Sequence, residues 1–186
     1  MLEWVEAIRA GLLIGLAVAA SVSDLARGKV YDTCTIPAMV LGLCLNIVLD
    51  GGNQATGFLG ANQHLVGSVA GACVALALFG LFWRAGAVGG GDLKLAVAFG
   101  MIEGPKFLVW AVACGSLIGA IIALGAMIRR GRLREGIAAS LRLSLRPWMW
   151  AAQVDETRAP LTVPYGLALS LGAIWVWAVS HGILVR

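Results

Sequence analysis

The chain has 186 residues, of which 60% are hydrophobic and only 13% are charged, and its mean hydropathy is +0.88. Soluble domains carry roughly 25% charged residues, so this composition excludes an ordinary soluble domain and fits about six membrane spans of roughly 20 residues. The net charge of +4 does not indicate a nucleic-acid partner, because basic residues in membrane-protein loops more often set orientation.

Six apolar segments follow one another, and they predict an all-α, polytopic protein folded as a single membrane-embedded domain over residues 1–186. We expect the spans near residues 5–22, 34–49, 64–83, 93–103, 107–128 and 161–184. The fourth segment is shorter than the ~20 residues that cross a bilayer. We therefore expect it to be a short helix buried by its neighbours, where irregular backbone is tolerated.

The basic residues predict the orientation of these spans. Eleven of the 14 lysines and arginines fall in or beside the loops after the first, third and fifth spans. Basic residues concentrate on the cytoplasmic side, so we expect the N-terminus outside and these three loops in the cytoplasm. The last of them, about residues 129–158, repeats leucine or isoleucine every four residues among arginines. It predicts an amphipathic helix on the anionic inner leaflet, with an irregular basic loop as the alternative.

The stretch "AVGGGDLKLAVAFG" contains the motif G-x-G-D, formed by Gly89, Gly90, Gly91 and Asp92. An aspartate at membrane depth is costly, which makes Asp92 a functional candidate. The glycines allow the backbone to bend and another chain to approach closely. Equally, Asp92 suits the N-terminus of a helix as a cap. A phosphate-binding loop is excluded, because no G-K-[ST] follows the glycines.

The predicted topology places Asp24, Asp32 and Asp92 on one membrane face, and Asp50 and Glu103 on the other. Two carboxylates in a partly dry site cannot both ionise easily, and such a pair can activate water for peptide hydrolysis. The candidates to pair with Asp92 are Asp24 and Asp32. The two histidines fall toward the external side, which excludes a Ser–His–Asp site, and the four cysteines show neither a CxxC pair nor a zinc pattern.

Taken together, these stretches resemble the type IV prepilin peptidase family of GxGD membrane aspartic peptidases, in particular the short forms that serve tight-adherence (Flp-type) pili. Asp24 is followed by "LARGKV", by Tyr31-Asp32 and by an apolar stretch that ends at Pro37. The second motif matches residues 89–95, and "VPYGLAL" at 163–169 is similar to the P-Y-G-x-A segment that opens the last span. The resemblance covers essentially the whole chain, with Tyr31 in place of the usual proline.

The resemblance implies that Asp24 and Asp92 are the catalytic pair and that Gly89, Gly90 and Gly91 support the motif's backbone. Asp32 occupies a position where the family accepts an amide, which cannot act as an acid or base. Asp32 is therefore a candidate for loop capping or leader binding. Lys94 would lie near Asp92, where it could bias the charge of that carboxylate or contact lipid phosphate.

The implied activity is aspartic endopeptidase cleavage of a short basic leader from prepilins whose apolar helix is inserted in the inner membrane, at the cytoplasmic face. No cofactor or metal is expected. N-methyltransferase activity is doubtful, because the sequence begins at the first span without the cytoplasmic CxxC domain of the long forms.

Three other readings stay open at this point. A presenilin-like GxGD protease is suggested by the Tyr31-Asp32 pair, although such pairs lie inside a span and this one lies in a basic loop. A transporter would place its carboxylates near the bilayer centre and show a repeat. A pilus-assembly scaffold would tolerate Asp24→Asn.

Overall fold

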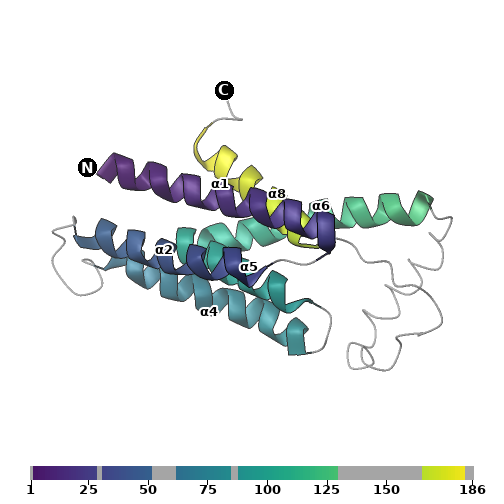
Figure 1. Ribbon diagram of the computed structural model, residues 1–186, viewed down its shortest axis with the longest axis horizontal. Coiled ribbons are helices and arrows are strands. Elements are labelled where there is room, and N and C mark those ends of the chain that lie inside the picture. The colour runs from purple at the N-terminus through teal and green to yellow at the C-terminus, as the bar shows by residue number, and fades with distance from the viewer. Residues whose placement is uncertain (1, 29–30, 52–61, 85–87, 130–164, 183–186) are drawn as a thin grey trace.

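The computed structural model describes residues 2–28, 31–51, 62–84, 88–129 and 165–182, which are helical apart from short connections. Figure 1 shows the helices as a bundle of roughly aligned rods. They are α1 (Leu2–Arg27), α2 (Asp32–Gly51), α4 (Gln63–Arg84), α5 (Gly90–Glu103), α6 (Pro105–Arg129) and α8 (Tyr165–Ser180). The prediction of an all-helical polytopic protein is therefore confirmed, while the predicted helix within 129–158 lies outside the described residues beyond Arg129.

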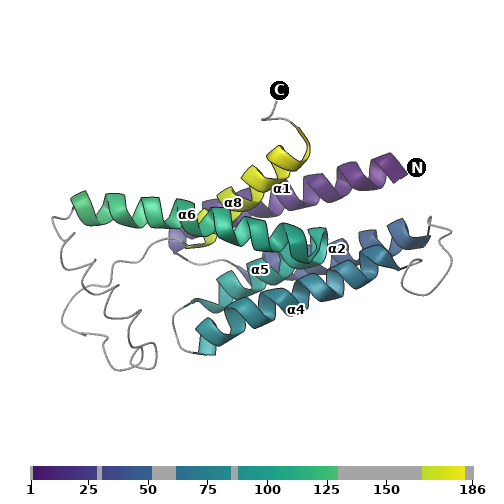
Figure 2. The same cartoon turned by 180° about the vertical axis from the view of Figure 1, so that it is seen from behind.

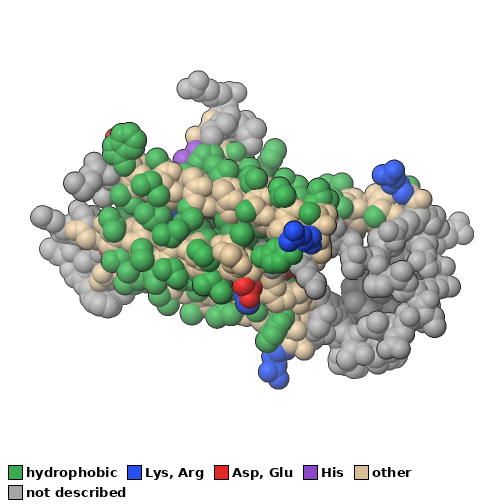
Figure 3. Space-filling view, in the orientation of Figure 1, with side chains coloured by type: hydrophobic (Ala, Val, Ile, Leu, Met, Phe, Trp, Pro, Cys, Tyr) green, Lys and Arg blue, Asp and Glu red, His purple; other side chains and the backbone are tan. Residues whose placement is uncertain are grey.

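Four helices, α1, α2, α4 and α6, are long and apolar enough to cross a membrane, and α8 is a shorter apolar helix. Their outward side chains are largely hydrophobic (Figure 3), as expected where lipid rather than water is the solvent. Helix α1 extends beyond the predicted span of 5–22, and Asp24, expected at the end of that span, lies in the last turn of the helix. Helix α2 likewise begins earlier than predicted, at Asp32, and contains Pro37.

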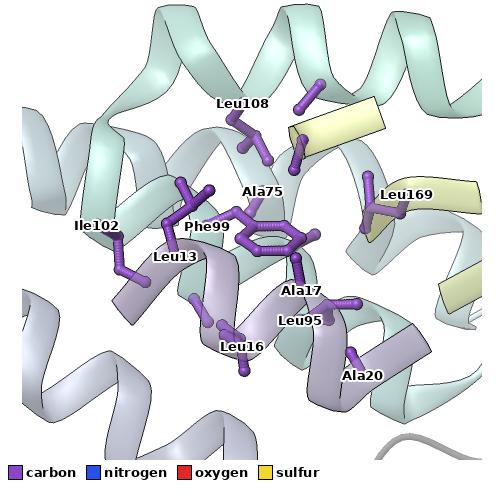
Figure 4. Packing of buried hydrophobic residues seen from close by; sticks show 14 of the residues in the cluster. Leu13, Leu16, Ala17, Ala20, Ala75, Leu95, Phe99, Ile102, Leu108 and Leu169 are labelled. Atoms are coloured by element: carbon purple, nitrogen blue, oxygen red, sulfur yellow. The ribbon is translucent and has the colours of Figure 1, made fainter. Parts of the chain in front are cut away.

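Helix α5 is the central helix of the bundle and contacts each of the other described helices. Its 14 residues extend about 21 Å, less than the ~30 Å hydrocarbon core. The expectation of a short helix buried by its neighbours is confirmed. Phe99 is fully buried at its centre, and apolar side chains of α1, α4, α6 and α8 surround it (Figure 4).

Two pairs of glycines bring helices into close contact. Gly71 of α4 faces Gly100 of α5, and a Cβ on either residue would overlap the other's backbone. Between α6 and α8, a Cβ on Gly172 would overlap the backbone of Gly115, and a Cβ on Gly115 would lie against the backbone of Leu169. Small residues at such crossings let backbones approach and gain packing energy in lipid. Seen from behind, α6 and α8 lie side by side (Figure 2).

Candidate active site

Two aspartates from distant parts of the sequence lie at the same end of the bundle. Asp24 is in the last turn of α1 and Asp92 is in the first turn of α5, and the two helices run in opposite directions (Figure 1). Asp24 is buried, with 6% of its surface exposed, and Asp92 is partly buried. Asp24 interacts electrostatically with Asp92. The fold thus brings two carboxylates together across about 70 positions of sequence.

The start of α8 holds the Asp24 side chain. Its carboxylate oxygen Oδ2 accepts a hydrogen bond from the backbone N–H of Leu167, at 2.8 Å. Leu167 is the third residue of α8, and the first four N–H groups of a helix have no intrahelical partner. An acidic side chain is also favoured at this positive end of the helix dipole. The hydrogen bond therefore fixes the position of the Asp24 carboxylate.

Asp92 differs from Asp24 in its surroundings. It lies just before the predicted fourth span, at the start of a helix that is not among the four long ones. Burial first, and the neighbouring charge of Asp24 second, raise the pKa of Asp92 to about 6. Tyr165 also interacts electrostatically with Asp92, and its hydroxyl hydrogen-bonds with Ser116 of α6. One carboxylate thus receives an N–H donor, whereas the other holds its proton to a higher pH than a free aspartate does.

The glycines before Asp92 form the entry into α5. Gly89 is the N-cap in an extended conformation, and no side-chain hydrogen bond caps this helix. Asp92 is therefore not the cap residue, although it lies in the first turn of the helix, where an anion is favoured. Neither Gly89 nor Gly90 has a positive φ. A Cβ on Gly89 would lie 3.5 Å from the Asp92 carboxylate, and one on Gly90 would lie 3.4 Å from the Trp83 indole nitrogen. Gly89 therefore places no side-chain atom of its own beside the Asp92 carboxylate, whereas Gly90 leaves room for the Trp83 ring.

Asp32 and Lys94 form an ion pair with each other. The Lys94 Nζ lies 2.5 Å from Asp32 Oδ2, and both side chains are about half exposed. The pair joins the first turn of α2 to the first turns of α5. Among the described residues, the carboxylate whose charge raises the pKa of Asp92 is that of Asp24 and not that of Asp32. Nearby, Arg27 hydrogen-bonds with the hydroxyl of Tyr31 at 2.8 Å.

The other acidic residues singled out by sequence have different partners. Asp50 accepts hydrogen bonds from the backbone N–H groups of His64 and Leu65, at 3.0 and 2.7 Å, and so caps the start of α4. Glu103 pairs with Arg9 and interacts with His181. These groups lie at the end of the bundle opposite Asp24 and Asp92, as the sequence indicated.

Sequence reasoning did not identify Leu167, which contributes only a backbone N–H, or Tyr165 as neighbours of the aspartates. The signal that the sequence offers for both residues is the "VPYGLAL" segment, which contains them. Its similarity to a family motif does not by itself indicate which residues it contacts. Within the described ranges, no group of three or more His, Cys, Asp or Glu side chains is placed to hold a metal ion. The chemistry available to the arrangement is that of two unequal carboxylates, which can share a proton and polarise a water molecule.

Comparison with known families gives one match. The family model described as the type IV leader peptidase family matches residues 11–124, which include α5 and most of α1 and α6. The matched range therefore contains both Asp24 and Asp92. The comparisons with curated proteins and with solved structures found no match.

Proposed function

The chain belongs to the type IV leader peptidase family, and from this premise we propose that it is an aspartic endopeptidase that cleaves the short basic leader of Flp-like type IV prepilins. The observation that carries this proposal is the pairing of Asp24 with Asp92, two inequivalent carboxylates at one end of a membrane bundle. Two such groups are what hydrolysis of a peptide bond by an activated water molecule requires.

In the proposed reaction, Asp24 is the base and Asp92 is the acid. Asp24, held by the Leu167 N–H, removes a proton from a water molecule as its oxygen attacks the scissile carbonyl carbon. Asp92 donates its proton to the carbonyl oxygen. When the C–N bond breaks, the leaving nitrogen takes up the proton held by Asp24 and Asp92 regains its own. The carboxylates end the cycle in the states in which they began.

The proposed substrate fits the exposed surface beside Asp92. An extended peptide needs room to approach a carboxylate, and Gly89 leaves a backbone surface without a side chain next to Asp92. An extended substrate segment can therefore lie across the entry to α5. The leader's basic residues would compete with Lys94 for the Asp32 carboxylate, which is about half exposed at the start of α2.

We also propose that the dyad faces the cytoplasm and that the protein resides in the inner membrane. The support is the concentration of lysines and arginines in the loops at the Asp24 end, because positive residues are retained on the cytoplasmic side. A basic leader would be retained on that side by the same rule, which places substrate and carboxylates together. Reporter fusions after residues 55 and 145 test the orientation, with the first expected outside and the second inside.

The experiment that tests the proposed function is co-expression of the chain with small pilin candidates that carry a basic leader and an apolar N-terminal helix. Mass measurement of each pilin should show loss of the leader and a new N-terminus only when the wild-type chain is present. Intact pilins across a panel that a known leader peptidase does process would contradict the proposal.

A further inference from the structure

Arg9 and Glu103 form an ion pair that links the same two helices as the aspartates, but at their opposite ends. The Arg9 Nε lies 3.4 Å from the Glu103 Oε1, and the two side chains are only 16% and 12% exposed. The two atoms are close enough for ion pairing, although they do not meet hydrogen-bond geometry. Arg9 also pairs with Glu6 on its own helix, at 2.9 Å. Of its two carboxylate partners, only Glu103 connects α1 to α5.

The last turn of α5 is held by a wider polar network. Arg9 donates to the Asn46 side-chain oxygen of α2, at 3.4 Å. The Asn46 amide donates to Ser68 of α4 at 2.7 Å and to the carbonyl oxygens of Met101 and Ile102 at 2.9 and 3.2 Å. Ser68 donates to the Met101 carbonyl as well, at 2.7 Å. Side chains of α1, α2 and α4 thus fix the end of α5, where backbone carbonyls lack intrahelical partners.

Between the ion pair and the aspartates, α1 and α5 meet through apolar side chains. Leu13 and Ala20 of α1 and Leu95, Phe99 and Ile102 of α5 belong to one buried cluster (Figure 4). Apolar packing tolerates small sliding and rotation, and in lipid it competes with equally apolar tails. A buried charge, by contrast, is costly to leave without its partner. The polar pair therefore specifies the register of these helices more strongly than the apolar contacts do.

The register of α1 against α5 also determines how Asp24 and Asp92 lie relative to each other. Asp24 follows Arg9 by 15 residues along α1, which is about 22 Å, and Asp92 precedes Glu103 by 11 residues along α5, about 16 Å. Each helix carries one member of each pair. Because the helices are antiparallel, the two pairs lie at opposite ends of the contact between α1 and α5. A shift of α5 against α1 at the Arg9 end displaces Asp92 relative to Asp24. We infer that Arg9 and Glu103 are positioning residues, whose ion pair sets the separation of Asp24 and Asp92.

A cavity of about 240 Å³ borders the pair and is lined by residues that include Arg9, Asn46, His64, Glu103 and Lys106. The cavity and the ion pair therefore lie at the end of the bundle opposite Asp24 and Asp92.

The inference rests on the proposed peptidase function, and a matched pair of substitutions tests it. Glu103→Gln removes the charge that pairs directly with Arg9 across α1 and α5, and it leaves Arg9 paired with Glu6. Glu6→Gln removes the same charge from the same arginine and leaves the link intact. A misplacement of about 1 Å between reacting groups costs up to ~100-fold in rate. We expect Glu103→Gln to lower kcat at least tenfold with KM nearly unchanged, and Glu6→Gln to stay within twofold of wild type.

Exchanging the two charges tests whether the ion pair itself restores activity. In all variants, cleavage rates are normalised to the amount of membrane-inserted protein. The double variant Arg9→Glu with Glu103→Arg restores an ion pair of opposite polarity, and we expect it to recover most of the kcat lost in Glu103→Gln. Equal losses in Glu103→Gln and Glu6→Gln, no loss in Glu103→Gln, or no recovery in the inserted double variant would each overturn the inference.

A second measurement does not require peptidase activity, so it separates failure of the inference from failure of the proposed function. Asp24→Cys and Asp92→Cys are combined in a chain whose four native cysteines are replaced by alanine, and the rate of disulfide formation is measured. We expect that rate to fall severalfold when Glu103→Gln is added and to be unchanged when Glu6→Gln is added. Equal rates in the two backgrounds would overturn the inference whatever the activity of the wild-type chain.

Discussion

The carboxylate of Asp24 accepts a hydrogen bond from the backbone N–H of Leu167, 143 positions later in the sequence, at 2.8 Å. This contact makes the first turn of α8 part of the candidate site, because it attaches the side chain of one aspartate to a rigid helix end. Tyr165, two residues earlier, adjoins the other aspartate. The last helix thus contributes to the surroundings of both carboxylates without supplying an acid or a base.

Removing the Leu167 donor should therefore impair catalysis. Leu167→Pro deletes the N–H, and proline is tolerated in the first helical turn, where that group has no intrahelical partner. A hydrogen bond to a charged group contributes about 1.5–3 kcal/mol, so we expect leader cleavage to slow by roughly 10- to 100-fold. Single-turnover cleavage in membranes measures this effect.

Leu167→Ala is the control, since it removes the same side-chain atoms beyond Cβ but keeps the N–H. It should retain most of the activity. If the proline and alanine variants were equally active, Asp24 would not depend on this hydrogen bond.

The pH dependence of cleavage should reflect Asp92. Its pKa is raised to about 6 by burial and by the charge of Asp24, so below about pH 6 it holds the proton that the proposed acid must donate. Above that pH the protonated fraction falls tenfold per pH unit. We expect kcat/KM to decline as the pH rises from 6 to 8, measured in detergent with a leader peptide. A flat profile across this range would contradict the assignment of Asp92 as the acid.

Packing of α5 against α4 should be sensitive to the smallest side chain. In Gly71→Ala, the added Cβ would overlap the backbone of Gly100, forcing the helices apart. Overpacking of this kind costs about 1–3 kcal/mol, so we expect a thermal unfolding midpoint lower by several degrees.

Gly80→Ala lies on the same helix, and its Cβ would meet no atom within 4 Å. It should leave the midpoint unchanged or raise it slightly, because alanine favours the helix. An equal fall in both variants would show that the Gly71–Gly100 crossing is not what the midpoint reports.

The ion pair between Asp32 and Lys94 should matter little for the chemistry. Both side chains are about half exposed, and exposed pairs contribute about 0–1 kcal/mol. Asp32→Asn is expected to keep at least half of the cleavage rate on a standard prepilin. Loss of all cleavage in Asp32→Asn would move Asp32 into the catalytic machinery.

Much of the architecture follows from hydropathy. Long apolar runs must form helices in lipid because their backbone groups have no other partners, and the short run of α5 had to be enclosed by its neighbours. The ends were less predictable. Helix α1 continues past the apolar run to Arg27, since polar residues near a membrane surface can extend a helix whose hydrogen bonds are already formed.

The candidate site was predictable only where a motif marked it. Asp24 and Asp92 stand out as carboxylates in apolar surroundings, whereas the Leu167 N–H is a backbone group that every residue type supplies. The partner of Lys94 is likewise set by how α2 and α5 pack, which no local spacing records. The link between Arg9 and Glu103 depends on the register of α1 against α5, and that register is a tertiary property.

The most direct test of the account is leader cleavage by the isosteric variants Asp24→Asn and Asp92→Asn, with Asp32→Asn as the matched control. Each is expressed with a processed prepilin, its insertion is verified, and the pilin's mass is determined. The account predicts intact leaders with Asp24→Asn and with Asp92→Asn, and a processed pilin with Asp32→Asn. Normal processing by an inserted Asp24→Asn or Asp92→Asn variant would contradict the two-aspartate mechanism.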